Sequence, residues 1–366
     1  MAKLGEVCDI LNGYAFKSNQ YTTSGVRIIR ISNVQKGYIE DKSPVYYPCD
    51  DENVKKYELK QNDLLISLTG NVGRTALLEE KFLPAALNQR VSCVRLKEPD
   101  KVLKTYLFHL LNSDYFEQQC MKAAEGVAQK NLSPKWLFEY KIPIYSIERQ
   151  KEISNTLDKI DLLIILRKQQ LAKLDELVKA RFVEMFGDLV VGDKIQTSKK
   201  KIGEIASVTK LAGFEFTKYI QYKEHGDIIM LRGLNCKQGK LILDDVKWID
   251  RKTSDLLPRS KLYYGDILMT YAGTIGDVAM VDENDKYHLA PNVAKVSINN
   301  KKAYNPIFLM YLFLYSNDYI MRFASQVAQA SINMEKIRNF EYYFPDVTFQ
   351  NQFATFVERV DKQKQT

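Results

Sequence analysis

The 366-residue sequence lacks any uninterrupted apolar stretch of about 18 residues, the length typical of a membrane-spanning helix. The N-terminus, which begins MAKLGEV, also lacks the apolar core of a signal peptide. Five cysteines lie far apart without a C-x-x-C pair, and this odd total fits neither a disulfide framework nor a zinc site. The three histidines add no metal-ligand spacing. We therefore predict a reduced, cytoplasmic protein with no membrane segment and no metal site.

Motifs of the common enzyme classes are also missing. The sequence has no G-x-G-x-x-G turn, no H-E-x-x-H motif and no G-x-S-x-G motif. The GLNCKQGK run from Gly233 has one residue too many between its glycines, and it is followed by Leu241 where a phosphate loop needs Ser or Thr. NPIF from Asn305 lacks the second proline of the Asn-Pro-Pro-aromatic motif of amino-methyltransferases. We predict that the chain is not an enzyme and carries no cofactor of its own.

The charge balance is basic but only moderately so. Lys and Arg total 53 against 45 Asp and Glu, which gives a net charge of +8 and a pI near 8.9. This excess favours an anionic partner such as DNA, although many basic proteins bind no nucleic acid. With 45% hydrophobic and 27% charged residues, the chain is expected to be globular, and its length predicts two or three domains.

The clearest feature present is an internal repeat of about 200 residues. KLGEV from Lys3 returns as KIGEI from Lys201, and FEYKIP from Phe138 returns as FEYYFP from Phe340. Further matched runs lie between them in the same order: GYAF and GFEF, IRISN and LRGLN, NDLLISLTGNVG and GDILMTYAGTIG, NSDY and SNDY, AQKNL and ASINM. A period of this length indicates duplicated domains rather than a solenoid of short units.

Each copy is predicted to be a mixed α+β domain. Short β-branched runs broken by Gly, Pro and Asn predict strands at residues 26–31, 64–68 and 91–96. Apolar faces at helical spacing predict helices over 103–116 and 307–323.

The two domains are predicted at residues 1–145 and 189–346. Aromatic residues near a domain start are usually part of the core. We assign four such residues to the core: Tyr14, Phe16, Phe214 and Phe216.

A long helix is predicted between the copies, over residues 146–188. Apolar residues recur there every three or four positions, as in the seam of a coiled coil. The seam comprises Ile153, Leu157, Ile160, Ile164, Leu171, Leu174, Val178 and Met185. Ser146 is suited to cap the start and Gly187 to stop the end, and about 40 residues at 1.5 Å each would make a rod of about 60 Å. The alternative is a helix packed on its own domain.

A second helix is predicted over residues 347–366. Gln350, Phe353, Val357 and Asp361 have the internal spacing of Gln150, Ile153, Leu157 and Asp161. This helix is about half as long as the first, so we expect the distal seam, from Leu171 to Met185, to lack a partner within the chain. The exposed distal helix would then associate two copies of the chain into a homodimer unless another protein covers it.

The order of module, long helix, module and helix resembles the specificity subunit of type I restriction-modification systems over nearly the whole chain. The resemblance is carried by the D-x-L-x-x-x-x-G-x-x-G run at Asp63 and at Asp266, by AQKNLS from Ala128, and by FEYKIPI leading into IERQKEI. It implies two target-recognition domains, each reading one half of a split site in double-stranded DNA. It also implies that the two helices pair as an antiparallel coiled coil, a spacer that fixes the gap between the halves.

The same resemblance implies protein partners. Methyltransferase subunits would dock on the helices and the inner faces of the domains, and restriction subunits would join the assembly through them. Those partners would supply S-adenosylmethionine, ATP and magnesium, so none of the three is expected on this chain.

Residues that contact bases are expected where the copies differ, because two different half-sites demand different contacts. Arg and Lys suit guanine edges or phosphates, and Asn and Gln suit adenine. The candidates in the first domain are Lys17, Arg27, Arg74, Asn88, Gln89, Arg90, Gln129 and Lys130. Those in the second domain are Lys218, Tyr271, Thr274, Asn292, Lys295, Gln326, Ser331 and Asn333. An ordinary surface role is the competing interpretation for each one.

Two residues that recur in both copies, Arg30 and Arg232, are expected to have a structural or phosphate-binding role. Two functional hypotheses remain open beside DNA reading. One is a truncated assembly protein that captures methyltransferase subunits without selecting a DNA site. The other is an enzyme with its own methyltransferase or nuclease centre, which the missing motifs disfavour.

Overall fold

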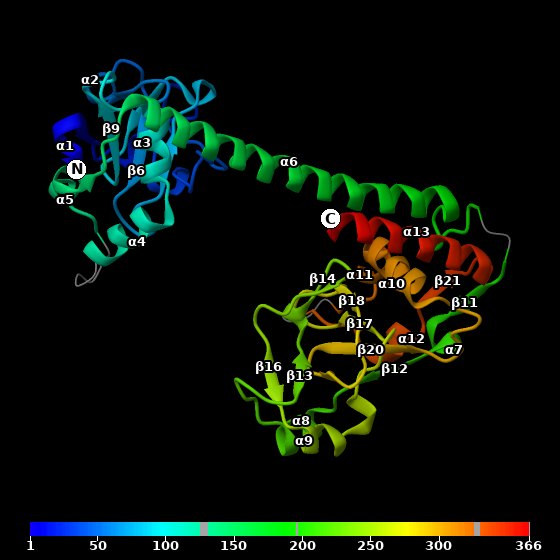
Figure 1. Ribbon diagram of the computed structural model, residues 1–366. Helices are drawn as coiled ribbons and strands as arrows, with labels where there is room; N and C mark the ends of the chain where they lie inside the picture. Colours follow the sequence, from blue (N-terminus) through cyan, green and yellow to red (C-terminus); the bar gives the residue numbers. More distant parts are fainter. Residues whose placement is uncertain (125–130, 195–196, 326–329, 366) are drawn as a thin grey trace. The chain divides into compact units, whose positions relative to one another are not determined.

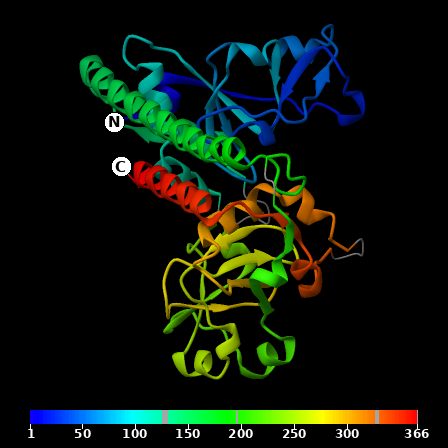
Figure 2. The ribbon, with the colours of Figure 1, turned by 90° about the vertical axis from the view of Figure 1, so that its right-hand side faces the viewer.

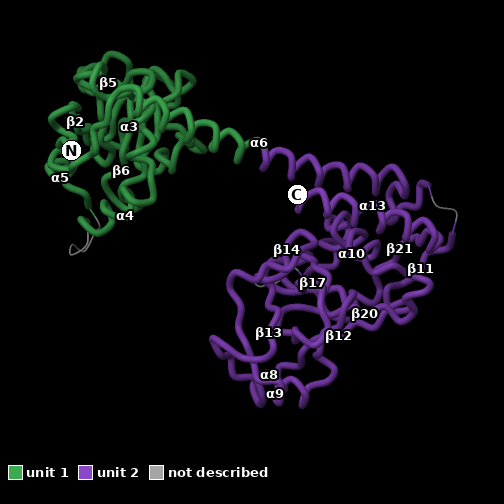
Figure 3. The backbone as a smooth tube through the Cα atoms, viewed as in Figure 1, with its two compact units in different colours: residues 1–166 green, residues 167–366 purple. Residues whose placement is uncertain are grey.

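The computed structural model describes residues 1–124, 131–194, 197–325 and 330–365. The chain divides into two compact units, unit 1 (residues 1–166) and unit 2 (residues 167–366), shown in Figure 3. Each unit contains one copy of the repeat, and both are mixed α/β domains, as predicted.

Two sheets form the centre of unit 1 (Figure 1). The first is antiparallel and has the order β2 (Cys8–Asn12), β9 (Val91–Leu96), β6 (Leu64–Ser67) and β7 (Thr75–Leu77). The second has the order β4 (Tyr46–Tyr47), β3 (Val26–Ile29), β8 (Ala85–Leu87) and β5 (Glu58–Leu59), and its β3 and β8 strands are parallel. The three predicted strands of this domain are confirmed as β3, β6 and β9.

Strand β6 shows why the first sheet is buried on both faces. Successive side chains of a strand point to opposite faces. Leu64 and Ile66 therefore join the apolar core under the helices, whereas Leu65 joins the core between the two sheets. All four residues of the strand are buried.

The helices of unit 1 are mostly short. They are α1 (Leu4–Val7), α2 (Glu52–Lys56), α3 (Lys104–Leu111), α4 (Asp114–Ala123), α5 (Pro134–Glu139) and the first part of α6 (Ile147–Phe186). The prediction of one helix over 103–116 is wrong, because α3 ends at Leu111 and Ser113 starts α4. The Ser113 hydroxyl accepts a hydrogen bond from the Phe116 backbone N–H at 3.2 Å, which is an N-cap.

Unit 2 repeats the antiparallel sheet with its strands in the same order, but its second sheet has three strands instead of four. Its antiparallel sheet is β12 (Ala206–Lys210), β20 (Val293–Ile298), β17 (Ile267–Thr270) and β18 (Val278–Met280). Its other sheets are β16 (Lys247–Ile249), β13 (Ile228–Leu231) and β19 (Tyr287–Leu289), and the pair β14 (Cys236–Lys237) and β15 (Lys240–Leu241). Its helices are α7 (Ile202–Ile205), α8 (Gly213–Tyr219), α9 (Arg251–Asp255), α10 (Pro306–Tyr315), α11 (Asn317–Met321), α12 (Met334–Arg338) and α13 (Val347–Gln365). The predicted helix over 307–323 is likewise divided, into α10 and α11.

Each module is closed by a strand pair that joins its beginning to its end. In unit 1, β1 (Ala2–Lys3) pairs with β10 (Lys141–Ile142). In unit 2, β11 (Lys199–Lys201) pairs with β21 (Glu341–Tyr343). Both pairs are antiparallel, and the second strand of each pair lies just before a long helix in the sequence.

A buried glutamine ties each long helix to its own module. The Gln150 side chain accepts a hydrogen bond from the Leu103 backbone N–H at 2.8 Å and donates to the Tyr145 carbonyl at 2.9 Å. The Gln350 side chain accepts from the Asn305 backbone N–H at 2.9 Å and donates to the Pro345 carbonyl at 2.8 Å. The repeat therefore extends from the sequence to individual hydrogen bonds.

Helix α6 matches the predicted long helix closely. It begins at Ile147, where the Ser146 hydroxyl accepts from the Arg149 backbone N–H at 3.3 Å, and ends at Phe186 before Gly187, whose φ is 64°. Its 40 residues correspond to about 60 Å at 1.5 Å per residue.

The last part of α6 packs antiparallel against α13 within unit 2, as predicted (Figures 1 and 2). Near the end of α6, Phe186 contacts Phe353 at the start of α13, with ring centroids 5.7 Å apart. Earlier in α6, Asp175 is ion-paired with Lys364 at the end of α13, at 2.8 Å.

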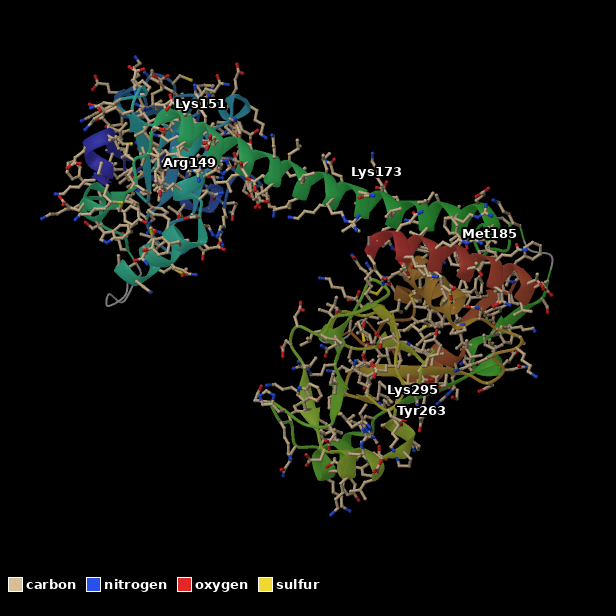
Figure 4. The ribbon with its side chains drawn as sticks, viewed as in Figure 1. Arg149, Lys151, Lys173, Met185, Tyr263 and Lys295 are labelled. Carbon is tan, nitrogen blue, oxygen red and sulfur yellow. The ribbon has the colours of Figure 1, made fainter. Side chains whose placement is uncertain are left out.

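The expectation that the distal seam lacks a partner is wrong. Val178 is buried, and Leu174 and Met185 pack against the same core as α13; Figure 4 shows Met185 near the end of α6, where α13 runs alongside. Although α13 is about half as long as α6, its 19 residues are enough to cover the distal seam. Because α13 covers much of that seam, the reason given for a homodimer through it no longer holds.

The exposed apolar stretch lies instead in the part of α6 that belongs to unit 1. We call residues 157–166 the open segment. It contains Leu157, Ile160, Leu162, Leu163, Ile164, Ile165 and Leu166, which are between 36% and 64% exposed. At 100° per residue, the five consecutive apolar residues 162–166 point in all directions around the helix. A helix that is apolar all round is normally buried. We therefore infer that another protein surface covers the open segment.

Candidate nucleic-acid interface

Three loops of unit 1 are joined by backbone hydrogen bonds at one end of β6. The Leu68 N–H donates to the Arg90 carbonyl at 2.9 Å, and the Leu132 N–H donates to the Leu68 carbonyl at 2.7 Å. The Gln89 N–H donates to the Tyr14 carbonyl at 2.9 Å, which adds the loop after β2. We call residues 68–69, 88–90 and 131–132 rim 1.

Unit 2 has the same arrangement. The Tyr271 N–H donates to the Asn292 carbonyl at 3.0 Å, and the Ile332 N–H donates to the Tyr271 carbonyl at 2.8 Å. The turn is anchored at Ala290, whose N–H donates to the Leu231 carbonyl at 3.2 Å, as Asn88 in unit 1 donates to Ile29. We call residues 271–272, 290–292 and 331–332 rim 2.

The two rims share a backbone but present different side chains. In the strand register, Val91 faces Ser67 and Val293 faces Thr270, so Arg90 and Asn292 occupy equivalent positions. Leu68 is likewise equivalent to Tyr271, and Asn131 to Ser331, through the bridges Thr69–Asn131 and Ala272–Ser331. Of these positions, Arg90, Asn131 and Asn292 are exposed. A common scaffold with different exposed groups is what two readers of different sequences require.

Several predicted contact residues lie on or beside these rims. Asn88, Gln89 and Arg90 form the turn of rim 1, and Tyr271, Asn292 and Ser331 belong to rim 2. Lys17 is exposed in the loop between β2 and β3, and Lys218 is exposed on α8 in the corresponding loop of unit 2. Thr274 is exposed in the turn after β17. Their contact with DNA stays a prediction.

Other predicted residues are already engaged by the protein. Arg27 is ion-paired with Asp41, and the Arg74 guanidinium donates to the Gln35 side chain at 2.6 Å. The Asn333 side chain accepts from the Lys336 backbone N–H at 2.8 Å and so caps α12. These contacts give all three residues a structural role. The predicted residues Gln129, Lys130 and Gln326 lie outside the residues that the structure describes.

Lys295 is a correction to the predicted contacts. It lies in β20, is only 8% exposed, and its ammonium group donates to the Arg259 carbonyl at 2.8 Å and the Lys261 carbonyl at 2.9 Å (Figure 4). Burial lowers the pKa of Lys295. Lys295 pairs with Leu268 of β17, and in unit 1 Cys93 pairs with Leu65 of β6, so Cys93 is the equivalent residue. A buried lysine whose ammonium group donates hydrogen bonds to backbone carbonyls does not face a DNA surface.

One aromatic residue that was predicted to be buried is exposed, and two arginines that were predicted to have a structural or phosphate-binding role have protein partners. Phe214, assigned to the core, is 72% exposed on α8, whereas Phe16 is buried and Tyr14 and Phe216 are partly buried. The core assignment used only the position near a domain start, which does not tell which face of α8 carries the side chain. Arg30 donates to the Ser43 carbonyl at 2.6 Å and Arg232 to the Asp245 carbonyl at 2.8 Å, which supports their structural role.

A buried histidine near Lys295 should make unit 2 sensitive to acid. His288 is fully buried, and its Nδ1 lies 3.0 Å from the Ser254 hydroxyl. Burial lowers the pKa of His288 to about 4, with the charges of Lys295 and Lys261 acting in the same direction. The unfolded chain binds this proton near pH 6.5, whereas the folded chain binds it only near pH 4. The stability that depends on the neutral ring is therefore present above pH 6.5 and is lost as the pH falls toward 4.

We expect the shifted pKa of His288 to make the free energy of unfolding about 2 kcal/mol lower at pH 5 than at pH 7. Urea unfolding at both pH values should show that His288→Gln reduces the pH dependence by that amount, whatever its effect at pH 7. His225→Gln, at an exposed histidine, is the matched control. An unchanged pH dependence in His288→Gln would show that the buried ring is not the titrating group.

Side chains that could ligate a metal ion do not cluster in the described ranges. Among those residues no group of three or more His, Cys, Asp or Glu side chains is placed to hold a metal ion. Of the cysteines, which are all free, only Cys49 is exposed, and burial raises the pKa of Cys8, Cys120 and Cys236 to about 12. None of the described helices combines the length and apolarity that crossing a membrane requires.

The model of one protein family matches both halves of the sequence. The family is described as the type I restriction modification DNA specificity domain, and it matches residues 1–176 and 196–366. The chain belongs to this family. Each match covers one repeat copy and its following helical segment, so the two modules of the structure correspond to two specificity domains.

Relatives with assigned names are specificity subunits of type I restriction enzymes. The chain is 27% identical over 384 residues to the EcoBI specificity subunit of Escherichia coli, covering 98% of this chain and 78% of that one. It is 32% identical over 186 residues to the MjaVIII specificity subunit of Methanocaldococcus jannaschii, covering 49% of this chain and 43% of that one.

Two solved structures share the fold. The type I restriction-modification S subunit from M. genitalium matches with a TM-score of 0.55 and 15% identity, over 100% of this chain and 89% of that one. A chain from a study of complex assembly and conformational transition of the type I restriction-modification system matches with a TM-score of 0.59 and 15% identity, over 99% and 90%. The specificity domain thus occurs twice in this chain, and the two solved structures share its fold.

Proposed function

We propose that this chain is the DNA-reading subunit of a type I restriction-modification complex, in which rim 1 reads one half of a split site and rim 2 reads the other. The observation that carries the proposal is the pair of rims, where the same backbone hydrogen bonds present different side chains. Because the exposed groups differ, the two half-sites are expected to differ in sequence.

We propose further that α6 acts as the spacer. A continuous helix of 40 residues begins in one module and ends in the other, and the pairing of its last part with α13 stiffens it there. Two readers joined in this way add their binding energies only on DNA whose half-sites have the matching separation. The site should therefore have a fixed gap of unread bases.

The open segment is the proposed docking surface for methyltransferase subunits. Fully burying a Leu or Ile side chain contributes about 1.5–3 kcal/mol, and this segment exposes seven of them. Restriction subunits would join through the methyltransferase subunits. In this proposal the chain performs no catalysis in the cytoplasm where it acts, and S-adenosylmethionine, ATP and magnesium are bound by the partners.

The test is a selection of bound duplexes from a randomised DNA library, using the full chain with its methyltransferase subunit. We expect enrichment of two unequal half-sites at one constant separation, with affinity at least about 1,000-fold above that for unrelated DNA. Capture of the methyltransferase subunit without any enriched sequence would contradict DNA reading.

That contrary result would favour the second candidate, an assembly protein that binds methyltransferase subunits without selecting a site. The exposed apolar side chains of the open segment favour this second candidate, because they offer a protein-binding surface that does not depend on the rims. Selection with the methyltransferase subunit alone is the control, since it should enrich no split site.

A further inference from the structure

One arginine of rim 1 differs from the other arginines of its module. Five arginines lie in residues 1–124, and four of their guanidinium groups have a protein partner: Arg27, Arg30, Arg74 and Arg95 bind Asp41, Ser43, Gln35 and Asp63 respectively. Within the described part of unit 1, the guanidinium of Arg90 has no hydrogen-bond or ion-pair partner. Arg90 is also exposed.

The backbone of Arg90 is fixed although its side chain is free. Its N–H donates to the Asn88 side chain at 3.3 Å, and its carbonyl accepts from the Leu68 N–H at 2.9 Å. The neighbouring N–H groups of Asn88 and Gln89 are held by Ile29 and Tyr14. A free guanidinium on a fixed turn loses little backbone entropy on binding, and its paired donors match the O6 and N7 acceptors of guanine.

Asn292 occupies the equivalent position in rim 2. Its carbonyl accepts from the Tyr271 N–H, as that of Arg90 accepts from Leu68. Its side chain has no hydrogen-bond partner in the described part of unit 2, and the donor and acceptor of a carboxamide match the N7 and N6 groups of adenine. Beside it, the Lys210 ammonium lies 5.4 Å from the centre of the Tyr271 ring, which places a positive charge near the rim.

We propose that Arg90 and Asn292 are the equivalent base-determining residues of the two modules, with Arg90 specifying a guanine in one half-site and Asn292 an adenine in the other. This assignment rests on the proposed function. Asn292 also has a φ of 67°, a conformation that asparagine tolerates well, so a purely conformational role is the competing explanation.

The experiment repeats the duplex selection on the complex of the full chain with its methyltransferase subunit, using Arg90→Ala and Asn292→Gly. Glycine keeps the positive φ while it removes the carboxamide. We expect Arg90→Ala to lose about 10- to 100-fold discrimination for guanine at one position of one half-site only. Asn292→Gly should lose a similar discrimination for adenine at one position of the other half-site. Arg149→Ala, which removes the same charge from α6, should retain the whole motif.

Each outcome decides a different question. If the unaltered chain enriches no split motif, the proposed function fails and the base assignment fails with it. If the motif is found but Arg90→Ala keeps its guanine, or weakens binding to all sequences equally, Arg90 is not a base reader and the proposed function stands. If Asn292→Gly keeps its adenine, Asn292 has only the conformational role. Unchanged circular dichroism and unfolding midpoints would exclude misfolding as the cause of any loss.

Discussion

Replacing Phe353 with alanine is expected to lower the free energy of unfolding of unit 2 by about 3–5 kcal/mol. Phe353 is fully buried, and its ring lies 5.3 Å from that of Phe182, 5.7 Å from that of Phe186 and 5.4 Å from that of Tyr311. Truncation would leave a cavity where α6, α10 and α13 meet. Because a domain of this kind has only about 5–15 kcal/mol of net stability, much of it would be lost.

Urea unfolding of the full chain, followed by circular dichroism, measures this effect. Phe349→Ala is the matched control, since that ring is on the same helix and is more than half exposed. The control should change stability by no more than about 0.5 kcal/mol. Equal effects of the two substitutions would mean that α13 is not held against α6 by the aromatic cluster.

Introducing two charges into the open segment is expected to weaken binding of the methyltransferase subunit by about 100-fold or more. The variant is Leu157→Glu with Ile164→Glu, at two positions that share one face of α6 and are exposed in the free chain. Losing two buried side chains at an interface forfeits about 3–6 kcal/mol, and each 1.4 kcal/mol is tenfold in affinity. Titration calorimetry with the purified methyltransferase subunit measures the change.

The stability of the free chain should hardly change, because neither side chain is buried before binding and glutamate favours a helix. Lys159→Glu, on another face of the same helical turns, controls for the added negative charge and should bind within a few-fold of the unaltered chain. Full affinity in the double variant would place the docking surface elsewhere.

Most of the fold was predictable because it depends on patterns that repeat. The duplicated runs predicted two modules, and Ser146 and Gly187 predicted the ends of α6 closely. The breaks between α3 and α4 and between α10 and α11 were missed, because apolar spacing continues across each break and only a single serine, Ser113 or Ser316, marks it. The partner of the distal seam was missed because it comes from the far end of the sequence.

The candidate site was harder to predict than the fold. Arg27, Arg74 and Arg90 have the same chemistry in the sequence. Only their neighbours show that Arg27 and Arg74 are engaged, whereas Arg90 has no side-chain partner among the described residues. Lys295 was predicted to be exposed because lysine is seldom buried, yet two backbone carbonyls accept hydrogen bonds from its ammonium group. Side-chain availability depends on contacts between residues distant in sequence, which one sequence does not reveal.

The short strand pairs β1–β10 and β11–β21 bring the entry and the exit of each module together. A segment whose two ends meet can be cut out and replaced by another of the same kind while the helices that flank it keep their positions. Under the proposed function, exchange of a whole module between related genes would replace one half-site and leave the other half-site, the gap and the protein partners unchanged.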